Sequence, residues 1–196
     1  MYRESISQFA ERFQHPAWGI NHFKRVYSMS LKLAEAEKVD LDEEAIFAAA
    51  FLHDMGAFEP FKDSLIDHAD RSTQLCVDKL LQFKFPAQKI ALVKDIIEHH
   101  MFYSDSGTSF EAVVFRDADM LDFMGYIGIT RMLSIVELDN WTPNLKSALD
   151  LIYKFSIELP EKLITSEAKK IGYIRKAEME EYLKVLSKET EDFKYL

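Results

Sequence analysis

An adjacent histidine and aspartate, His53 and Asp54, lie at the end of an apolar run that begins at Ala48. A neutral imidazole beside a carboxylate is a mixed nitrogen and oxygen ligand pair for a divalent cation. The small residues before the pair, such as Ala50, favour a buried helix. Gly56 fits a C′ position, at which the chain leaves that helix with a positive φ. We therefore expect the pair at the mouth of a helix bundle rather than on a solvent face.

Two further polar side chains, His22 and Asp119, fall on apolar helix stripes. The segment from Gly19 to Glu37 has apolar residues at helical spacing, and this pattern places His22 on its inward face. Spacing alone favours a core histidine bonded to a backbone carbonyl. Asp119 follows Phe115 by four residues and shares its inward face, where a carboxylate needs a cation or strong hydrogen bonds.

The elements that must position these residues are helices, because no run strongly resembles a strand. We expect Pro160 to break the helix that starts near Asn144, and the segment from Ala57 to Asp67 to be a loop over the helix mouth. Apolar periodicity and end signals predict helices at residues 2–14, 19–37, from 40, 68–82, from 86, from 110, 144–158 and, as one or two helices, 161–188.

Composition restricts the class of protein and its partners. The chain of 196 residues suits one domain, and 48% of its residues are apolar. Its formal charge is −9, so duplex nucleic acid or an anionic membrane surface is not an expected partner. We expect no membrane span, because no apolar run approaches the roughly 18 residues that suggest one.

The single cysteine, Cys76, excludes an intramolecular disulfide and favours a reducing cytoplasm. Its apolar helical neighbours indicate a small buried hydrophobe rather than a reactive thiol. The first residues also lack a signal-peptide pattern, and we therefore expect a cytoplasmic protein.

The polar residues singled out above occur in the order His, His-Asp, Asp on successive helices. In this order the chain resembles the HD superfamily of metal-dependent phosphohydrolases, and in particular small stand-alone bacterial HD-domain hydrolases. The resemblance covers roughly residues 15 to 133, and it is carried by Asn21–Val26, Phe51–Gly56, Asp117–Asp122 and Gly125–Arg131. It implies an all-α, compact multi-helix HD-domain bundle that forms a single domain over residues 1–196. The helices of residues 144–190 would then pack on the motif core.

The resemblance implies that His22, His53, Asp54 and Asp119 are the metal ligands, with Asp117 as the rival for the last position. This overturns the core-histidine interpretation of His22. Asp54 would orient or deprotonate the attacking water, which makes it the catalytic residue. Mixed nitrogen and oxygen ligation admits manganese, cobalt, nickel, iron, zinc or magnesium, with one or two ions bound.

Three more histidines, His68, His99 and His100, form a second group of candidates. By resemblance they would bind a second metal or the substrate phosphate, and the alternative is that they are surface residues at helix ends. Arg25 and Arg131 lie in motif segments and are the expected partners of phosphate charge, ahead of other cations such as Arg116.

The expected function is cleavage of a phosphate ester of a small metabolite, such as a nucleotide, by metal-activated water. The related nucleotidase pattern has an acid where this chain has Ala57. The alternatives are an HD-fold ligand-binding or signalling module without turnover and a di-iron oxygenase. The sequence leaves the oligomeric state open.

Overall fold

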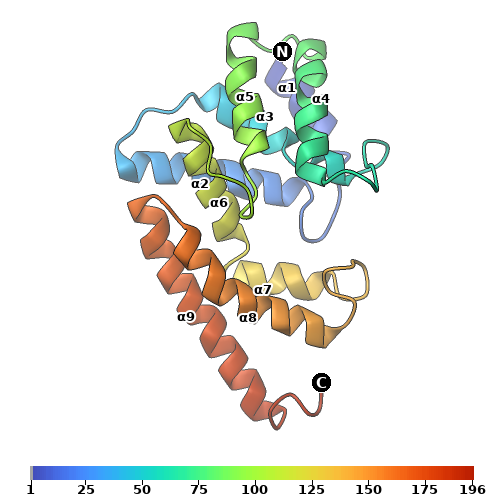
Figure 1. Cartoon of the computed structure of the whole chain (residues 1–196), viewed down its shortest axis with the longest axis vertical. Helices are drawn as coiled ribbons and strands as arrows, with labels where there is room; N and C mark the ends of the chain where they lie inside the picture. The colour runs from blue at the N-terminus through green and yellow to red at the C-terminus, as the bar shows by residue number, and fades with distance from the viewer. Residues whose placement is uncertain (1) are drawn as a thin grey trace. The chain divides into compact units, whose positions relative to one another are not determined.

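A computed structural model describes residues 2–196 and contains α-helices with two short 3-10 turns and no strand in that range (Figure 1). This confirms the predicted all-α class. The described chain divides into two compact units, residues 1–119 and 120–196, and the division falls inside helix α6. None of its helices is long and apolar enough to cross a membrane.

Six helices begin in the first unit. They are α1 (Tyr2–Ala10), α2 (Ile20–Glu37), α3 (Glu43–Leu52), α4 (His68–Gln82), α5 (Ile90–Glu98) and α6 (Phe110–Asp122), with 3-10 turns at Met55–Ala57 and Ala87–Lys89. The first helix ends at Ala10 and not at the predicted Gln14. Just beyond this end, Nε of Arg12 donates a hydrogen bond to the carbonyl oxygen of Phe9 at 3.0 Å.

Helix α3 is the central helix of this unit. Every residue from Ala45 to Leu52 is buried, and the helix packs against α1, α2 and α5. A helix that is apolar on all sides requires neighbours on all sides. Its start is fixed by Asp42, whose side chain accepts a hydrogen bond from the backbone N–H of Ala45 at 3.1 Å. His53 directly follows the other end of the helix.

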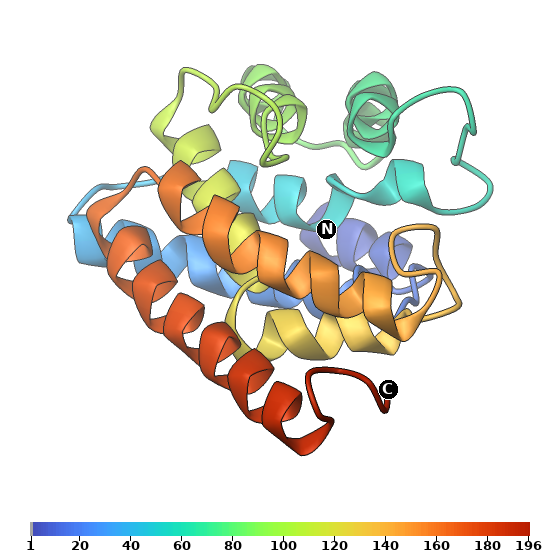
Figure 2. The same cartoon turned by 60° about the horizontal axis from the view of Figure 1, so that its bottom comes forward.

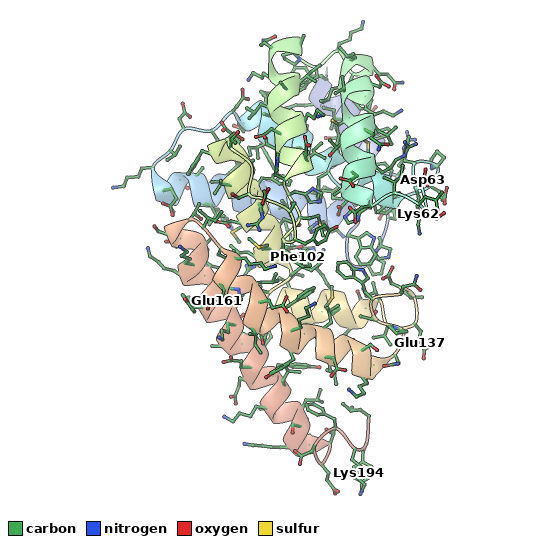
Figure 3. The ribbon with its side chains drawn as sticks, viewed as in Figure 1. Lys62, Asp63, Phe102, Glu137, Glu161 and Lys194 are labelled. Atoms are coloured by element: carbon green, nitrogen blue, oxygen red, sulfur yellow. The ribbon has the colours of Figure 1, made fainter. Side chains whose placement is uncertain are left out.

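The loop between α3 and α4 is anchored by phenylalanine rings. The ring centroid of Phe58 lies 4.9 Å from that of Phe13, and the centroid of Phe61 lies 5.6 Å from that of Phe9. Lys62, which follows Phe61, is exposed (Figure 3). The loop therefore packs on α1 and on the chain that follows it, and only part of it faces solvent.

The second unit contains α7 (Gly125–Ser134), α8 (Leu145–Lys162) and α9 (Ser166–Glu189), and α8 and α9 lie side by side (Figure 2). The prediction that Pro160 breaks α8 is wrong, because the helix continues to Lys162. A proline in the last turn removes one hydrogen-bond donor from a helix that ends two residues later. The expectation that these helices pack on the motif core stays a prediction.

Candidate metal centre

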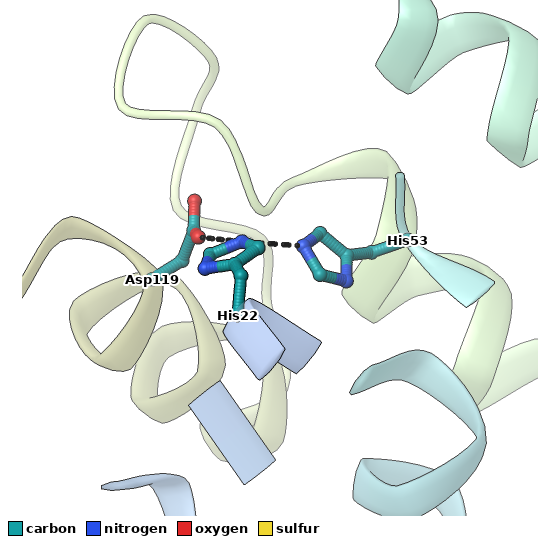
Figure 4. A group of neighbouring side chains, drawn as sticks. All are labelled: His22, His53 and Asp119. Carbon is teal, nitrogen blue, oxygen red and sulfur yellow. Dashed lines mark hydrogen bonds and ion pairs between the residues drawn. The ribbon is translucent and has the colours of Figure 1, made fainter. Parts of the chain in front are cut away.

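Three of the predicted ligands converge from three different helices. His22 lies in the first turn of α2, His53 directly follows α3, and Asp119 lies near the end of α6. The Nε2 atom of His22 is 3.2 Å from Nε2 of His53 and 3.2 Å from Oδ1 of Asp119 (Figure 4). All three side chains are almost completely buried.

Asp54 completes this arrangement. Its Oδ2 atom lies 3.2 Å from Nε2 of His53 and 3.5 Å from Nε2 of His22. The structure therefore brings the donor atoms of all four predicted ligands together within the first unit.

Two of the histidine nitrogens that face the centre, Nε2 of His53 and Nε2 of His100, carry lone pairs. His53 uses Nδ1 to donate to the carbonyl oxygen of Ala50 at 2.9 Å, and His100 uses Nδ1 to donate to that of Ile97 at 2.6 Å. A carbonyl oxygen can only accept, so the proton of each neutral ring is on Nδ1 and Nε2 is free to bind a cation. Backbone carbonyls often fix metal-binding histidines in this way.

His68 and His100 lie on the other side of Asp54. Its Oδ1 atom is 3.5 Å from Nε2 of His68 and 3.6 Å from Nε2 of His100. His53, Asp54 and His100 thus form a second group of converging donor atoms, which shares His53 with the group of His22 and Asp119. His100 is completely buried, whereas His68 is about a quarter exposed (26%).

The two carboxylates of the centre are held ionised. Burial alone would raise the pKa of Asp54, but electrostatic interaction with His53, and with the nearby His100 and His68, holds it well below its ordinary value. Burial likewise opposes ionisation of Asp119, and electrostatic interaction with the nearby ring of His22 lowers its pKa below the ordinary value. Asp117 is also fully buried, but it belongs to neither group of converging donor atoms.

His99 is turned away from this centre. Its Nδ1 atom lies 2.8 Å from the carbonyl oxygen of Asp95 and 3.2 Å from that residue's Oδ1 atom. The two adjacent histidines follow the last residue of α5, and their side chains point in different directions. The one that faces the centre is His100.

The predicted phosphate-binding arginines have different surroundings. Arg25 is half-buried on α2, one helical turn after His22. Arg131 belongs to the second unit, where NH1 pairs with Oδ2 of Asp122 at 2.9 Å and the guanidinium lies 4.1 Å from the ring centroid of Phe123. Its charge is therefore already balanced by a carboxylate of its own unit.

Gly56 positions α4 beside the end of α3, but not in the predicted way. It has no positive φ and lies within the 3-10 turn Met55–Ala57. A Cβ at this position would come within 2.4 Å of the carbonyl oxygen of His68, and the Gly56 N–H donates to Oγ of Ser72 at 2.9 Å. The glycine is required for close approach to the first turn of α4, which carries His68.

Sequence reasoning missed the contacts of Asp67. One oxygen of Asp67 accepts from the backbone N–H of Ala69 at 2.8 Å and lies 3.7 Å from Nδ1 of His68. The other accepts from the hydroxyl of Tyr103 at 2.8 Å. An aspartate directly before a helix signals an N-cap, so the first contact was readable from the sequence. Nothing local pointed to Tyr103, which is 36 residues away.

Arg116 holds the loop that follows His100. Its guanidinium donates to the backbone carbonyl oxygens of Met101, Phe102 and Ser104 at 3.2 to 3.3 Å (Figure 3 labels Phe102). Burial lowers its pKa, and the charges of Asp117 and other carboxylates oppose that effect. These contacts make it a residue that positions the loop.

The donor set fits a divalent cation. Two nitrogen or oxygen atoms bound to one ion at about 2.1 Å lie about 3.0 to 3.4 Å apart, which is the spacing around His22. Among residues 2–196, Nε2 of His100 and Oδ1 of Asp119 are buried and form no hydrogen bond. Buried polar atoms without hydrogen bonds are rare, and a bound ion would satisfy them. Nitrogen and oxygen donors in this mixture suit several transition metals.

Comparison with solved structures gives the same fold over nearly the whole chain. A predicted HD superfamily hydrolase from an uncultured Thermotogales bacterium has 25% identity and a TM-score of 0.65, covering 95% of this chain and 90% of the other. Bacillus subtilis YpgQ, in a complex with ADP, has 22% identity and a TM-score of 0.72, covering 95% and 97%. A protein from Lactobacillus plantarum has 24% identity and a TM-score of 0.70, covering 96% of both chains.

No curated protein matches the sequence significantly. The family model described as the HD domain, in contrast, matches residues 19–124, which is more than half of the chain. The matched segment contains His22, the His53-Asp54 pair and Asp119 together with the helices that carry them. The chain belongs to the HD domain family.

Proposed function

We propose that this protein is a metal-dependent phosphohydrolase that cleaves a phosphate ester of a small metabolite, with nucleotides as the first substrate class. The observation that carries the proposal is the convergence of four buried side chains on Nε2 of His22. This atom lies 3.2 Å from Nε2 of His53, 3.2 Å from Oδ1 of Asp119 and 3.5 Å from Oδ2 of Asp54. The relative from B. subtilis in complex with ADP supports testing nucleotides first.

In this proposal His22, His53, Asp54 and Asp119 hold one divalent ion. Such an ion supplies a Lewis acid for a phosphate oxygen and lowers the pKa of water. The hydrogen bond from Nδ1 of His53 to the carbonyl oxygen of Ala50 keeps the ring in the tautomer that leaves Nε2 free to bind the ion. Asp54 stays ionised and has a second oxygen, Oδ1, directed to His68 and His100, so it can orient a water molecule and accept its proton.

His68 is the most exposed residue of the centre, with 26% of its side chain accessible against 8% for Asp54. It lies between the carboxylates of Asp54 and Asp67. An imidazole that carries both ring protons can bind a phosphate oxygen or donate a proton to a leaving group. We assign His68 to the substrate side of the site and His100 to its buried side.

The experiment is a hydrolysis assay on chelator-treated protein to which each candidate metal is returned. A panel of nucleotides and sugar phosphates is incubated with it, and all phosphorus-containing products are measured. The control is a His53→Ala, Asp54→Ala double variant, with its folding checked by circular dichroism. Hydrolysis that requires both the metal and the pair supports the proposal. Hydrolysis that persists in the double variant, or a loaded protein that cleaves nothing in the panel, contradicts it.

A di-iron oxygenase is the second candidate, because the group of His53, Asp54 and His100 offers donors beside the first group. His53 has one free lone pair and can bind one ion at a time, so a second ion would rely on Asp54, His68 and His100. Metal analysis distinguishes the two interpretations. Two irons per chain with oxygen consumption would favour the oxygenase, and tight nucleotide binding without turnover would favour a ligand-binding module.

A further inference from the structure

A groove of about 440 Å³ lies between α1 and the end of α4, entirely within the first unit. Two phenylalanines, Phe9 and Phe83, contribute its apolar lining, with their ring centroids 5.3 Å apart. None of the candidate metal ligands lines this groove, and the end of α4 that borders it is three turns away from His68. It is therefore separate from the metal centre.

Two cations line the groove, and both are held against the same aromatic ring. The guanidinium carbon of Arg12 lies 4.4 Å from the ring centroid of Phe9, and the ammonium of Lys79 lies 5.3 Å from it. Lys79 is also 5.0 Å from the centroid of Phe61. Cation–π contacts of this kind fix a charged group without neutralising it. Within residues 2–196 neither side chain forms an ion pair with a carboxylate.

The remaining polar lining consists of neutral side chains that can donate hydrogen bonds, namely Ser5, Gln8 and Gln82. No carboxylate belongs to the lining among the described residues, although the chain as a whole carries a formal charge of −9. Gln82 accepts a weak hydrogen bond from Lys79 at 3.4 Å, and Gln8 donates one to Glu4 at 3.4 Å. The groove is thus a local positive surface on an acidic protein.

We infer that this groove is a second binding site, and that its ligand is a small phosphorylated anion. A phosphate group presents several negative oxygens, so a single ligand can contact both cations that lie on the ring of Phe9. Arg12 donates from Nε to the carbonyl oxygen of Phe9, and a guanidinium has two terminal nitrogens with which it can bind such a group in a bidentate way. The groove and the metal centre share the first unit, and the inference does not depend on the proposed hydrolysis.

The test is a calorimetric titration with inorganic phosphate, pyrophosphate, a sugar phosphate and citrate, each in the presence of chelator. The host is the 196-residue chain with His53→Ala and Asp54→Ala, which lacks two of the four proposed metal ligands. Arg12→Gln, Lys79→Gln is the groove variant. Its matched control is Lys32→Gln, Lys62→Gln, which removes the same charge from positions outside the groove.

We expect at least one phosphorylated probe to bind the host and the control equally. It should bind the groove variant at least about tenfold more weakly. Tightest binding of inorganic phosphate would indicate a free phosphate ion as the ligand. Tightest binding of the sugar phosphate would indicate the phosphate group of a metabolite. Equal binding by the groove variant, absence of binding to the host, or citrate binding as tightly as the phosphates would overturn the inference.

Arg12 packs on Phe9, so its replacement could disturb folding. A second variant, Gln8→Glu, keeps the size of an exposed side chain and places a carboxylate in the lining. It should weaken binding of the same probe by repulsion while the unfolding temperature stays within about two degrees of the host's. Unchanged binding in this variant would also count against the site.

Discussion

His99 and His100 show how much depends on the direction of a single side chain. The sequence places two identical side chains at the end of α5, and a one-residue step decides which faces Asp54. The structure selects His100, whose ring is buried and whose Nδ1 atom is fixed by the carbonyl oxygen of Ile97. His99 is fixed instead on Asp95. Helical periodicity becomes unreliable where a helix ends, and the sequence therefore could not decide which of the two histidines faces Asp54.

The pair provides a matched mutational test. We expect His100→Ala to reduce kcat/KM of the proposed hydrolysis by about 10- to 100-fold, because it removes a buried donor beside Asp54. His99→Ala should leave the rate within about twofold, because that ring binds Asp95 and belongs to neither group of converging donor atoms. Steady-state kinetics and the metal content of both variants are the measurements. Equal effects of the two substitutions would contradict the assignment.

Gly56 is the residue at which a sound sequence inference failed for a physical reason. A glycine after a helix usually marks a positive φ, and the sequence cannot distinguish that role from close packing. Here the missing Cβ is what matters, since the carbonyl oxygen of His68 occupies its place.

We expect Gly56→Ala to destabilise the protein by about 1 to 3 kcal/mol, because the added methyl group must displace backbone atoms of α4. Urea unfolding measures this change. Ala57→Ser, at the next and half-buried position of the same turn, serves as the control and should shift stability by much less. A Gly56→Ala protein as stable as the wild type would show that α4 can move away at little cost.

At the scale of elements, the helix starts were largely predictable. Asp42 and Asp67 cap α3 and α4 as their positions before the helices suggest. Helix ends were less predictable, because signals such as a proline place the last residue of a helix only approximately. The end of α1 at Ala10 and the continuation of α8 past Pro160 are two examples. The contact of Tyr103 with Asp67 likewise joins segments that no local pattern connects.

The stabilisation that Asp42 gives to the first turn of α3 depends on pH. Burial opposes its ionisation, but the hydrogen bonds from Lys89 and from the Ala45 N–H lower its pKa below 3.8. Because the folded pKa is the lower one, ionised Asp42 stabilises the fold above about pH 4, and that contribution is lost as the pH falls through the folded pKa.

Asp42→Ala should therefore lower the free energy of unfolding by about 1 kcal/mol at pH 7. Asp42→Asn should lower it by less, because the amide oxygen can still accept the Ala45 N–H. Urea unfolding of the wild type and both variants between pH 7 and pH 3 tests both points. The difference between the wild type and the Asp42→Asn variant must shrink towards pH 3. A difference that grows with acidity would refute the assigned role of the carboxylate.

At the scale of the whole molecule, the all-α class and the HD family were predictable from the sequence because they depend on repeated and local patterns. Apolar stripes indicated the helices, and an ordered set of histidines and aspartates indicated the family. The division into two units inside α6, directly after Asp119, was not predictable. It depends on contacts between helices that are distant in the sequence, and no composition change or linker marks the boundary.

Metal removal should affect the stability of the protein as a whole, because the proposed ion joins α2, α3 and α6. An ion present at a hundred times its Kd stabilises the native state by about 2.7 kcal/mol. For a chain of this length we expect chelator to lower Tm by roughly 5 to 10 °C. Differential scanning calorimetry with metal and with chelator is the measurement. The His53→Ala protein should show no such difference, and an equal shift in that variant would place the stabilising ion elsewhere.

The buried donor atoms around Asp54 also bear on the lifetime of the protein in a cell. Imidazole lone pairs and carboxylates that face one another without a cation make the ion-free chain the less stable form, and unstable chains are removed by proteases. If the proposed ion binds there, the abundance of this protein would follow the supply of that metal. A shortage would then deplete the molecule itself, in addition to leaving individual copies inactive.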